Sequence, residues 1–296
     1  MPAFYAHERF GRLVLQQLGG VPAEAAKHYA SYFRIGLQGP DFLFYYKPWR
    51  LGNRVAAYGI RLHEQSARPF FVHAQQVAGA AGRGSAAYAY LLGFVCHYVL
   101  DSRCHPYVNA AMQVTGAGHL EIEEEFDKAL LRKDGEDPLR WPIADYIPAD
   151  AETAAKVSLF YPDVTEAEVR QALVDFKKVK RFLTAPGALH QALINTAMRL
   201  SGKFHEYKGL MMQRRDNVRC AKSNEELYRL MMDAIPAAVE DVDALDLCIQ
   251  LGRAPGLAFS KTFEGNEGNH GTKDEHEPCR NAGPGTHPGA AGAGIV

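Results

Sequence analysis

The stretch GFVCHYVLDSRCHPYV (residues 93–108) is mostly apolar, which predicts a buried helix, yet it also contains histidine and aspartate side chains. His97, Asp101 and His105 follow one another at intervals of four residues, so on a helix they lie along one stripe. Burying charged groups is costly unless they are paired or bound to a metal ion. The segment is therefore compatible both with a hydrogen-bonded His–Asp pair in the core and with a metal site.

Helical signals continue along the chain up to about residue 259. Ser85 can cap the helix that contains this stretch, and Pro106 is expected to end it. No region shows the sustained alternation with β-branched residues that is typical of strands. The sequence therefore predicts an all-α fold, a multi-helix single domain. The other expected helices are 7–18, 22–35, 53–79, 117–132, one that begins at a Thr165–Glu168 capping box, one between Pro186 and Gly202, and one that begins at a Ser223–Glu226 capping box.

The composition changes at about residue 260. Residues 260–296 are rich in glycine and nearly lack large apolar side chains, so they cannot bury enough surface to offset the entropy cost of ordering. We therefore expect a helical domain over residues 1–259 and a disordered tail over 260–296. His270, His276 and His287 lie in this tail, and without a fixed geometry they are not expected to form a site.

The bulk composition limits the partners and the location of the protein. With 296 residues, of which 47% are hydrophobic, the chain can form one large core. The net charge of −1 gives no general attraction to nucleic acid, which is the less expected partner. The N-terminus lacks the apolar run of a signal peptide, and the longest apolar stretch is too short to span a bilayer, so we expect a cytoplasmic protein. The five cysteines are scattered without a CxxC pair, and we interpret them as small buried side chains before metal ligands.

Four further segments contain candidate ligands. In GHLEIEEEF, His119 and Glu123 lie one helical turn apart, although acidic residues in a first turn also interact favourably with the helix dipole. His63 lies in an expected helix, where a lone histidine is commonly a core or surface group. Asp41 follows Gly-Pro, where an aspartate is commonly a turn residue, and His7 lies in the first helix. Imidazole and carboxylate groups without paired thiolates suit Zn²⁺ in a catalytic setting.

Taken in their order along the chain, these residues resemble the pattern of the zinc-dependent phospholipase C family, whose superfamily also contains fungal single-strand-specific nucleases. The family pattern is an N-terminal His, an Asp in a loop, a His in a helix, HxxxD with a further His, and finally HxxxE or HxxxD. The resemblance covers about residues 1–130 and implies an all-α enzyme with a trinuclear zinc site. The matching positions are His7, Asp41, His63, His97, Asp101, His105, His119 and Glu123.

The resemblance also implies a role for each position in a bridged pair of zinc ions. Asp101 would bridge the two ions. His63 and His97 would complete the site of one of them, with Asp41 close enough to ligate it or to act as general base. His7 would bind the other ion, and a bridging hydroxide would attack phosphorus.

The third zinc ion would be held by His105, His119 and Glu123 and would stabilise the leaving oxygen. Two features differ from the family pattern. The next His follows the bridging Asp after four positions rather than six. Family members also begin with a Trp whose amine and carbonyl ligate zinc. Here removal of the initiator methionine would leave Pro2 at the same offset before the first histidine as in the nucleases, and we hypothesise that Pro2 takes this role.

We interpret the sequence as that of a zinc-dependent phosphodiester hydrolase, phospholipase C-like, with up to three zinc ions. Its expected substrate is a small-molecule or phospholipid phosphodiester, with peripheral membrane contact as a further expectation. The alternatives are a single-strand nuclease on the same scaffold and a non-catalytic zinc-binding domain. Aromatic side chains after Asp41 either line the substrate entrance or pack in the core, namely Phe42, Phe44, Tyr45, Tyr46 and Trp49.

Overall fold

The structure, a computed structural model, describes residues 4–50, 52–142 and 144–267. These residues are mainly helical and contain no strand, so the predicted all-α, multi-helix domain is confirmed. Pro2 and the tail histidines His270, His276 and His287 lie outside the described residues. The helices are α1 (Phe4–Gln17), α2 (Gly20–His28), α3 (Ala30–Gly36), α4 (Arg54–Glu64), α5 (Arg68–Ala81), α6 (Ala86–Thr115), α7 (His119–Lys133), α8 (Ala151–Ser158), α9 (Glu166–Leu183), α10 (Ala188–Leu200), α11 (Phe204–Tyr207) and α12 (Ala221–Leu251), with 3₁₀ turns η1 (Asp41–Tyr45), η2 (Lys208–Leu210), η3 (Val218–Cys220) and η4 (Leu257–Phe259).

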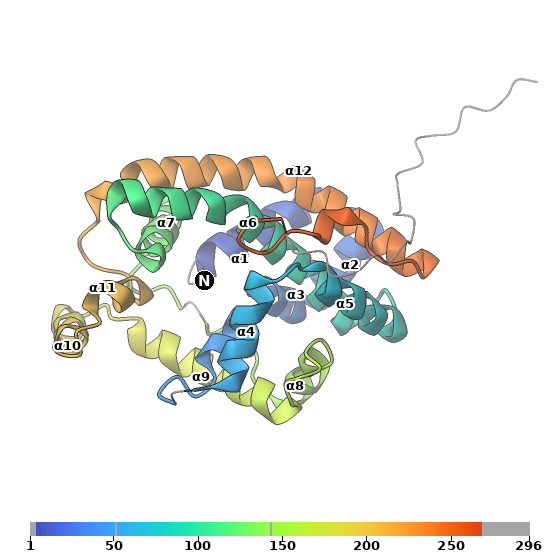
Figure 1. Cartoon of the computed structure of the whole chain (residues 1–296), viewed down its shortest axis with the longest axis horizontal. Coiled ribbons are helices and arrows are strands. Elements are labelled where there is room, and N and C mark those ends of the chain that lie inside the picture. The colour runs from blue at the N-terminus through green and yellow to red at the C-terminus, as the bar shows by residue number, and fades with distance from the viewer. Residues whose placement is uncertain (1–3, 51, 143, 268–296) are drawn as a thin grey trace, which may run out of the picture.

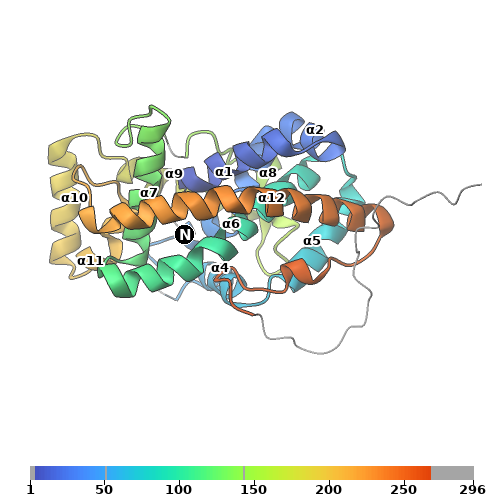
Figure 2. The same ribbon diagram turned by 90° about the horizontal axis from the view of Figure 1, so that it is seen from above.

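The 30-residue helix α6 runs through the centre of the molecule (Figure 1). Every residue from Ala86 to Asp101 is buried, as expected of a helix that is apolar around most of its circumference. α3, α12 and α7 pack against α6, and η1 contacts both α4 and α9. Seen from above, α12 extends along the molecule and the chain after it turns back toward α4 (Figure 2).

α3 and α6 approach each other so closely that glycines face the opposite backbone. A Cβ atom on Gly93 would lie 2.1 Å from the carbonyl oxygen of Phe33, and one on Gly36 would lie 2.1 Å from that of Tyr90. Only a residue without a side chain fits at either position. This contact places the chain that follows α3 against the polar stripe of α6.

Pro106 does not end the central helix. α6 continues well beyond it, so the predicted boundary was wrong. A proline inside a helix supplies no N–H to the carbonyl four residues earlier, here that of Ser102. Burial of Val108 and Ala111 stabilises the helix beyond the proline. His105 is therefore helical and stays on the same stripe as the two polar residues before it.

Three other helix boundaries also differ from prediction. The expected helix 53–79 is divided into α4 and α5, because Pro69 lies in the first turn of α5, where a missing N–H is tolerated. The expected helix 22–35 is divided at Tyr29. α12 begins before Ser223, which is buried inside the helix and does not form the predicted cap.

The capping box at the start of α9 is confirmed. The side chain of Thr165 accepts a hydrogen bond from the backbone N–H of Glu168, and the carboxylate of Glu168 accepts one from the N–H of Thr165. Glu168 also pairs with Arg54 of α4 at 2.7 Å. The box therefore links α9 to the helix that carries His63.

Thr165→Ala is expected to lower the free energy of unfolding by about 1 kcal/mol, because α9 loses an N-cap hydrogen bond. The measurement is the change in unfolding free energy from urea titration. Thr196→Ala is the matched control, since Thr196 is exposed in the interior of α10, where alanine is the better helix former. Equal destabilisation by the two substitutions would contradict the capping role.

The C-terminal boundary of the domain lies later than the composition predicts. Phe263 is 1% exposed, and Ser260 and Thr262 are also buried. The chain therefore packs against the domain through Ser260, Thr262 and Phe263, beyond the predicted boundary, and residues 268–296 lie outside the described part of the chain. None of the described helices combines the length and the apolar character needed to cross a bilayer.

Candidate metal centre

Five elements bring the predicted ligands into one cluster. All are buried except His119, whose side chain is 22% exposed. The ligands and their elements are His7 from α1, Asp41 from η1, His63 from α4, His97, Asp101 and His105 from α6, and His119 and Glu123 from α7.

Asp101 lies at the centre of this cluster. Its Oδ1 atom lies 3.1 Å from Nε2 of His7 and 3.7 Å from Nε2 of His105. Its Oδ2 atom lies 3.1 Å from Nε2 of His97 and 3.9 Å from Nε2 of His63. The two oxygens of one carboxylate therefore face two different sets of histidines, which is the arrangement of a bridging ligand.

Two further carboxylates complete the sets. Oδ1 of Asp41 lies 3.1 Å from Nε2 of His63. Oε1 of Glu123 lies 3.2 Å from Nε2 of His119 and 3.3 Å from Nε2 of His105. Atoms around one tetrahedral zinc ion lie about 3.4 Å apart, because each is about 2.0–2.2 Å from the metal. Three groups have atoms close enough to share an ion, namely His7–His97–Asp101, Asp41–His63–His97 and His105–His119–Glu123.

Backbone carbonyls set the orientation of three of the imidazole rings. Nδ1 of His63, His97 and His105 lies 2.8, 3.2 and 3.0 Å from a carbonyl oxygen, those of Gly59, Leu37 and Phe263 respectively. Nδ1 donates to the carbonyl, so in the neutral ring Nε2 keeps its lone pair. These Nε2 atoms are buried, have no hydrogen-bond partner among the described residues, and face carboxylate oxygens. Opposed lone pairs in a buried site need a proton or a metal ion between them, so the residues fit a bound metal ion.

The electrostatics of the cluster favour positive charge at His97 and His105. Burial lowers the pKa of His105, but the carboxylates of Asp101 and Glu123 outweigh burial and raise that pKa to about 9. Burial also lowers the pKa of His97, and Asp101 and Asp41 outweigh it and raise that pKa. Burial opposes ionisation of Asp101, yet the imidazoles of His97 and His105 hold its pKa well below its usual range. Anionic carboxylates and basic imidazoles in one buried site are the groups from which a divalent ion displaces protons.

A carboxylate that the spacing arguments missed positions the first ligand. Asp127 accepts hydrogen bonds from the backbone N–H groups of Tyr5 and Ala6, at 2.9 and 2.7 Å, and so caps the first turn of α1. This fixes α1, and with it His7, against α7. Asp127 lies four residues after Glu123 on the same helix, a spacing that could have indicated it.

A cleft of about 740 Å³ opens beside the cluster, and His63 lines it. Most of its other lining side chains are apolar, including Phe44, Tyr45, Ile60, Leu120, Val179 and Leu210. Among the lining residues the other charged side chains are Glu64 and Glu264, and none is lysine or arginine. Of the aromatic residues after Asp41, Phe44 and Tyr45 line the cleft, whereas Phe42 packs in the core.

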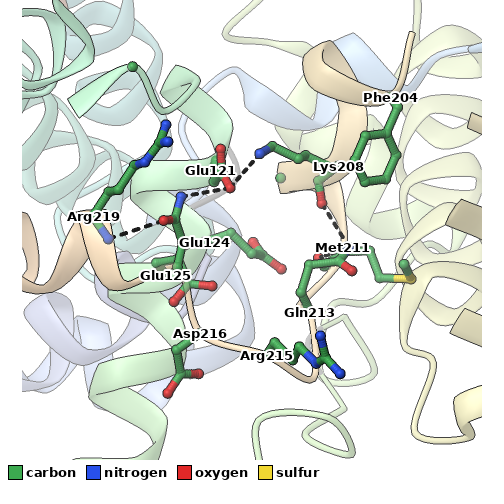
Figure 3. Close-up of a pocket in the computed structure, with 13 residues that line it drawn as sticks. Glu121, Glu124, Glu125, Phe204, Lys208, Met211, Gln213, Arg215, Asp216 and Arg219 are labelled. Atoms are coloured by element: carbon green, nitrogen blue, oxygen red, sulfur yellow. Dashed lines mark hydrogen bonds and ion pairs between the residues drawn. The ribbon is translucent and has the colours of Figure 1, made fainter. Parts of the chain in front are cut away.

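A separate cavity of about 440 Å³ lies on another face of α7 (Figure 3). Glu121 pairs with Lys208 at 2.6 Å, and the buried Lys128 pairs with Glu125 at 2.6 Å and with Asp216 at 3.0 Å. The acidic run of α7 therefore has two uses. One of its carboxylates, that of Glu123, lies in the cluster of candidate ligands, and others hold the chain between η2 and η3 against the helix.

A comparison with models of protein families matches residues 6–178 to the zinc-dependent phospholipase C family. The match covers more than half of the chain and all eight candidate ligand positions of the cluster, and the chain belongs to this family. Neither the search of curated proteins nor the search of solved structures found a match.

Proposed function

We propose that the protein is a zinc-dependent phosphodiester hydrolase of the phospholipase C type. The observation that carries this proposal is the position of Asp101, whose two carboxylate oxygens face separate sets of histidines. Up to three zinc ions would be held. His63, His97 and Asp41 would hold the first and His7 the second, with Asp101 shared between these two. The third would be held by His105, His119 and Glu123. Bound zinc supplies Lewis acidity toward phosphoryl oxygens and toward water.

Asp41 is the residue that we assign to proton transfer. Its Oδ1 atom is buried and has no hydrogen-bond partner among the described residues. This atom lies 3.1 Å from Nε2 of His63, a residue that lines the cleft. A carboxylate in this place can accept the proton of a water molecule that attacks phosphorus. Pro2, the hypothesised N-terminal ligand, lies outside the described residues and stays a prediction.

The cleft supports a phospholipid or another phosphodiester with an apolar group as the substrate. Apolar side chains form most of its wall, so acyl or similar groups can be buried there. A single-strand nuclease needs basic side chains along the nucleic-acid backbone. Glu64 and Glu264 supply the opposite charge, which disfavours a polynucleotide.

Exposed apolar side chains near the cleft support peripheral contact with a membrane surface. Trp49 is 74% exposed, and Ile60, which lines the cleft, is 48% exposed. Trp49 directly follows Pro48, another lining residue. An exposed tryptophan beside an apolar cleft suits insertion at the boundary between lipid head groups and acyl chains.

The proposed function is tested by metal analysis of the purified full-length protein combined with a substrate panel. The panel contains a chromogenic phosphodiester, phosphatidylcholine vesicles and single-stranded DNA. We expect bound zinc and hydrolysis of the first two, lost on chelation and restored by zinc. Cleavage of DNA without cleavage of lipid would support the nuclease alternative. Bound zinc without turnover of any substrate would support a non-catalytic zinc-binding domain.

A further inference from the structure

The segment after α12 makes contact with the metal centre, although it lies beyond the residues that match the family. After α12 the chain turns back, and residues 258–267 reach α4 (Figures 1 and 2). We call this segment the C-terminal strap. The Phe263 ring lies 4.8 Å from the ring of His63 and 5.8 Å from that of His97, measured between centroids.

Backbone hydrogen bonds attach the strap to the elements that carry the ligands. The N–H of Phe263 donates to the carbonyl of His63 at 3.3 Å, and the carbonyl of Phe263 accepts from Nδ1 of His105 at 3.0 Å. The N–H of Ala67 donates to the carbonyl of Lys261 at 3.0 Å. The strap therefore joins α4, the start of α5 and α6 at the level of the ligands.

The break in the hydrogen-bond ladder of α6 is the place where the strap docks. Pro106 has no N–H, so the carbonyl of Ser102 lacks the usual helical hydrogen bond from the residue four positions later. Gly265, with φ +77°, lies against it, and a Cβ atom there would be 2.4 Å from the Ser102 oxygen and 2.6 Å from the proline ring. Only glycine permits this approach, because both the backbone conformation and the space exclude a side chain.

A second contact holds the strap at the same level. Glu264 accepts a hydrogen bond from Asn109 of α6 at 2.9 Å, and its other carboxylate oxygen lies 3.4 Å from Nδ1 of His105. Glu264 also lines the substrate cleft. The strap thus places two acceptors beside one ring nitrogen and forms part of the cleft wall.

We propose that the C-terminal strap belongs to the metal centre. The Phe263 carbonyl would position the ring of His105 so that Nε2 of His105 faces the metal. Phe263 and Glu264 are positioning residues, since they act through His105. The inference rests on the proposed metal site, but its first readout does not need zinc. An outer-shell acceptor of this kind orients a ligating imidazole, and its loss weakens metal binding by about 10–100-fold.

The test is Gly265→Ala in the full-length protein, with Gly252→Ala as the matched control. Gly252 also has a positive φ, of +63°, but has open space around its Cα hydrogens, so it shares the backbone strain without the clash. In the metal-free wild type we expect a slowly exchanging Nδ1 proton of His105 in the NMR spectrum. In Gly265→Ala this proton should exchange at least about tenfold faster and zinc affinity should fall about 10–100-fold, with both unchanged in Gly252→Ala.

A folded Gly265→Ala protein with an unchanged His105 proton and unchanged zinc affinity would overturn the inference. Faster exchange in a protein that never binds zinc would uphold the positioning of His105 and reject the proposed function instead. If circular dichroism shows that Gly265→Ala is unfolded, Asn109→Ala replaces it, because Asn109 is exposed and its side chain bonds to Glu264. The same change in exchange, at smaller size, is then expected, and its absence also overturns the inference.

Discussion

Replacement of Asp101 by alanine is expected to remove the zinc ions that we propose it bridges and to abolish the proposed hydrolysis. The substitution deletes both oxygens that face His7 and His97 at 3.1 Å, so the two proposed ions would lose their shared ligand and would repel each other without an anion between them. Loss of an outer-shell partner lowers metal affinity or activity by about 10–100-fold, and loss of the bridge should exceed that range. Metal analysis and kcat/KM for a chromogenic phosphodiester measure both effects, and His97→Ala is expected to behave in the same way.

Asp246→Ala is the control for the removal of a buried carboxylate. Asp246 is 6% exposed and accepts hydrogen bonds from Arg83, so its loss leaves a cation without its partner and should destabilise the fold. It does not belong to the metal cluster, and the zinc content of the folded protein should stay at the wild-type level. Full zinc content in folded Asp101→Ala would remove Asp101 from the site and with it the main support for the proposed function.

The shared face of candidate ligands that lie four residues apart on a helix was predictable from sequence. A helix turns once in about 3.6 residues, so His97 and Asp101, and likewise His119 and Glu123, had to share a face once their segments were helical. Tertiary contacts between segments that are distant in sequence follow no such local rule. Sequence reasoning assigned His7 and Asp41 to the site only through the family resemblance, which rests on the order of the residues along the chain.

The contacts that hold the candidate ligands in place could not be predicted from sequence, and the physical reason differs from contact to contact. Pro106 was expected to end α6, because local preference disfavours helix there, but packing beyond the proline overrides that preference. Residues 260–267 have a tail-like composition, yet burial of Phe263 and its backbone hydrogen bonds order them. Asp127 caps α1 from more than a hundred residues away in the sequence, and only the tertiary structure shows that contact.

The position of His97 depends on the same close packing that holds α3 to α6. Its Nδ1 atom lies 3.2 Å from the carbonyl of Leu37, the residue that directly follows α3. Gly39, with φ +50°, lies so close to the His97 ring that a Cβ atom would be 2.1 Å from it. The carbonyl can be this near only because Gly36 and Gly93 let the two backbones meet. Fold stability and ligand geometry are therefore coupled at this crossing.

Gly93→Ala is accordingly expected to lower the free energy of unfolding by about 3 kcal/mol or more and to weaken zinc binding in the protein that still folds. The added methyl group would meet the Phe33 carbonyl at 2.1 Å, a rigid backbone atom, so α3 must move away from α6. Urea unfolding measures the first effect and metal analysis of the folded fraction the second.

Gly79→Ala is the matched control for a glycine in a helix. Its Cβ atom would lie 3.8 Å from a side-chain carbon of Ile249, an ordinary van der Waals contact, and Gly79 is exposed within α5. Because alanine restricts the unfolded chain and favours helix, this substitution should raise stability by about 0.5–1 kcal/mol and leave the zinc content unchanged. Since both substitutions gain the same helix propensity, the difference between them isolates the cost of separating α3 from α6. If Gly93→Ala were as stable as Gly79→Ala and kept its zinc, the crossing would not be what positions His97.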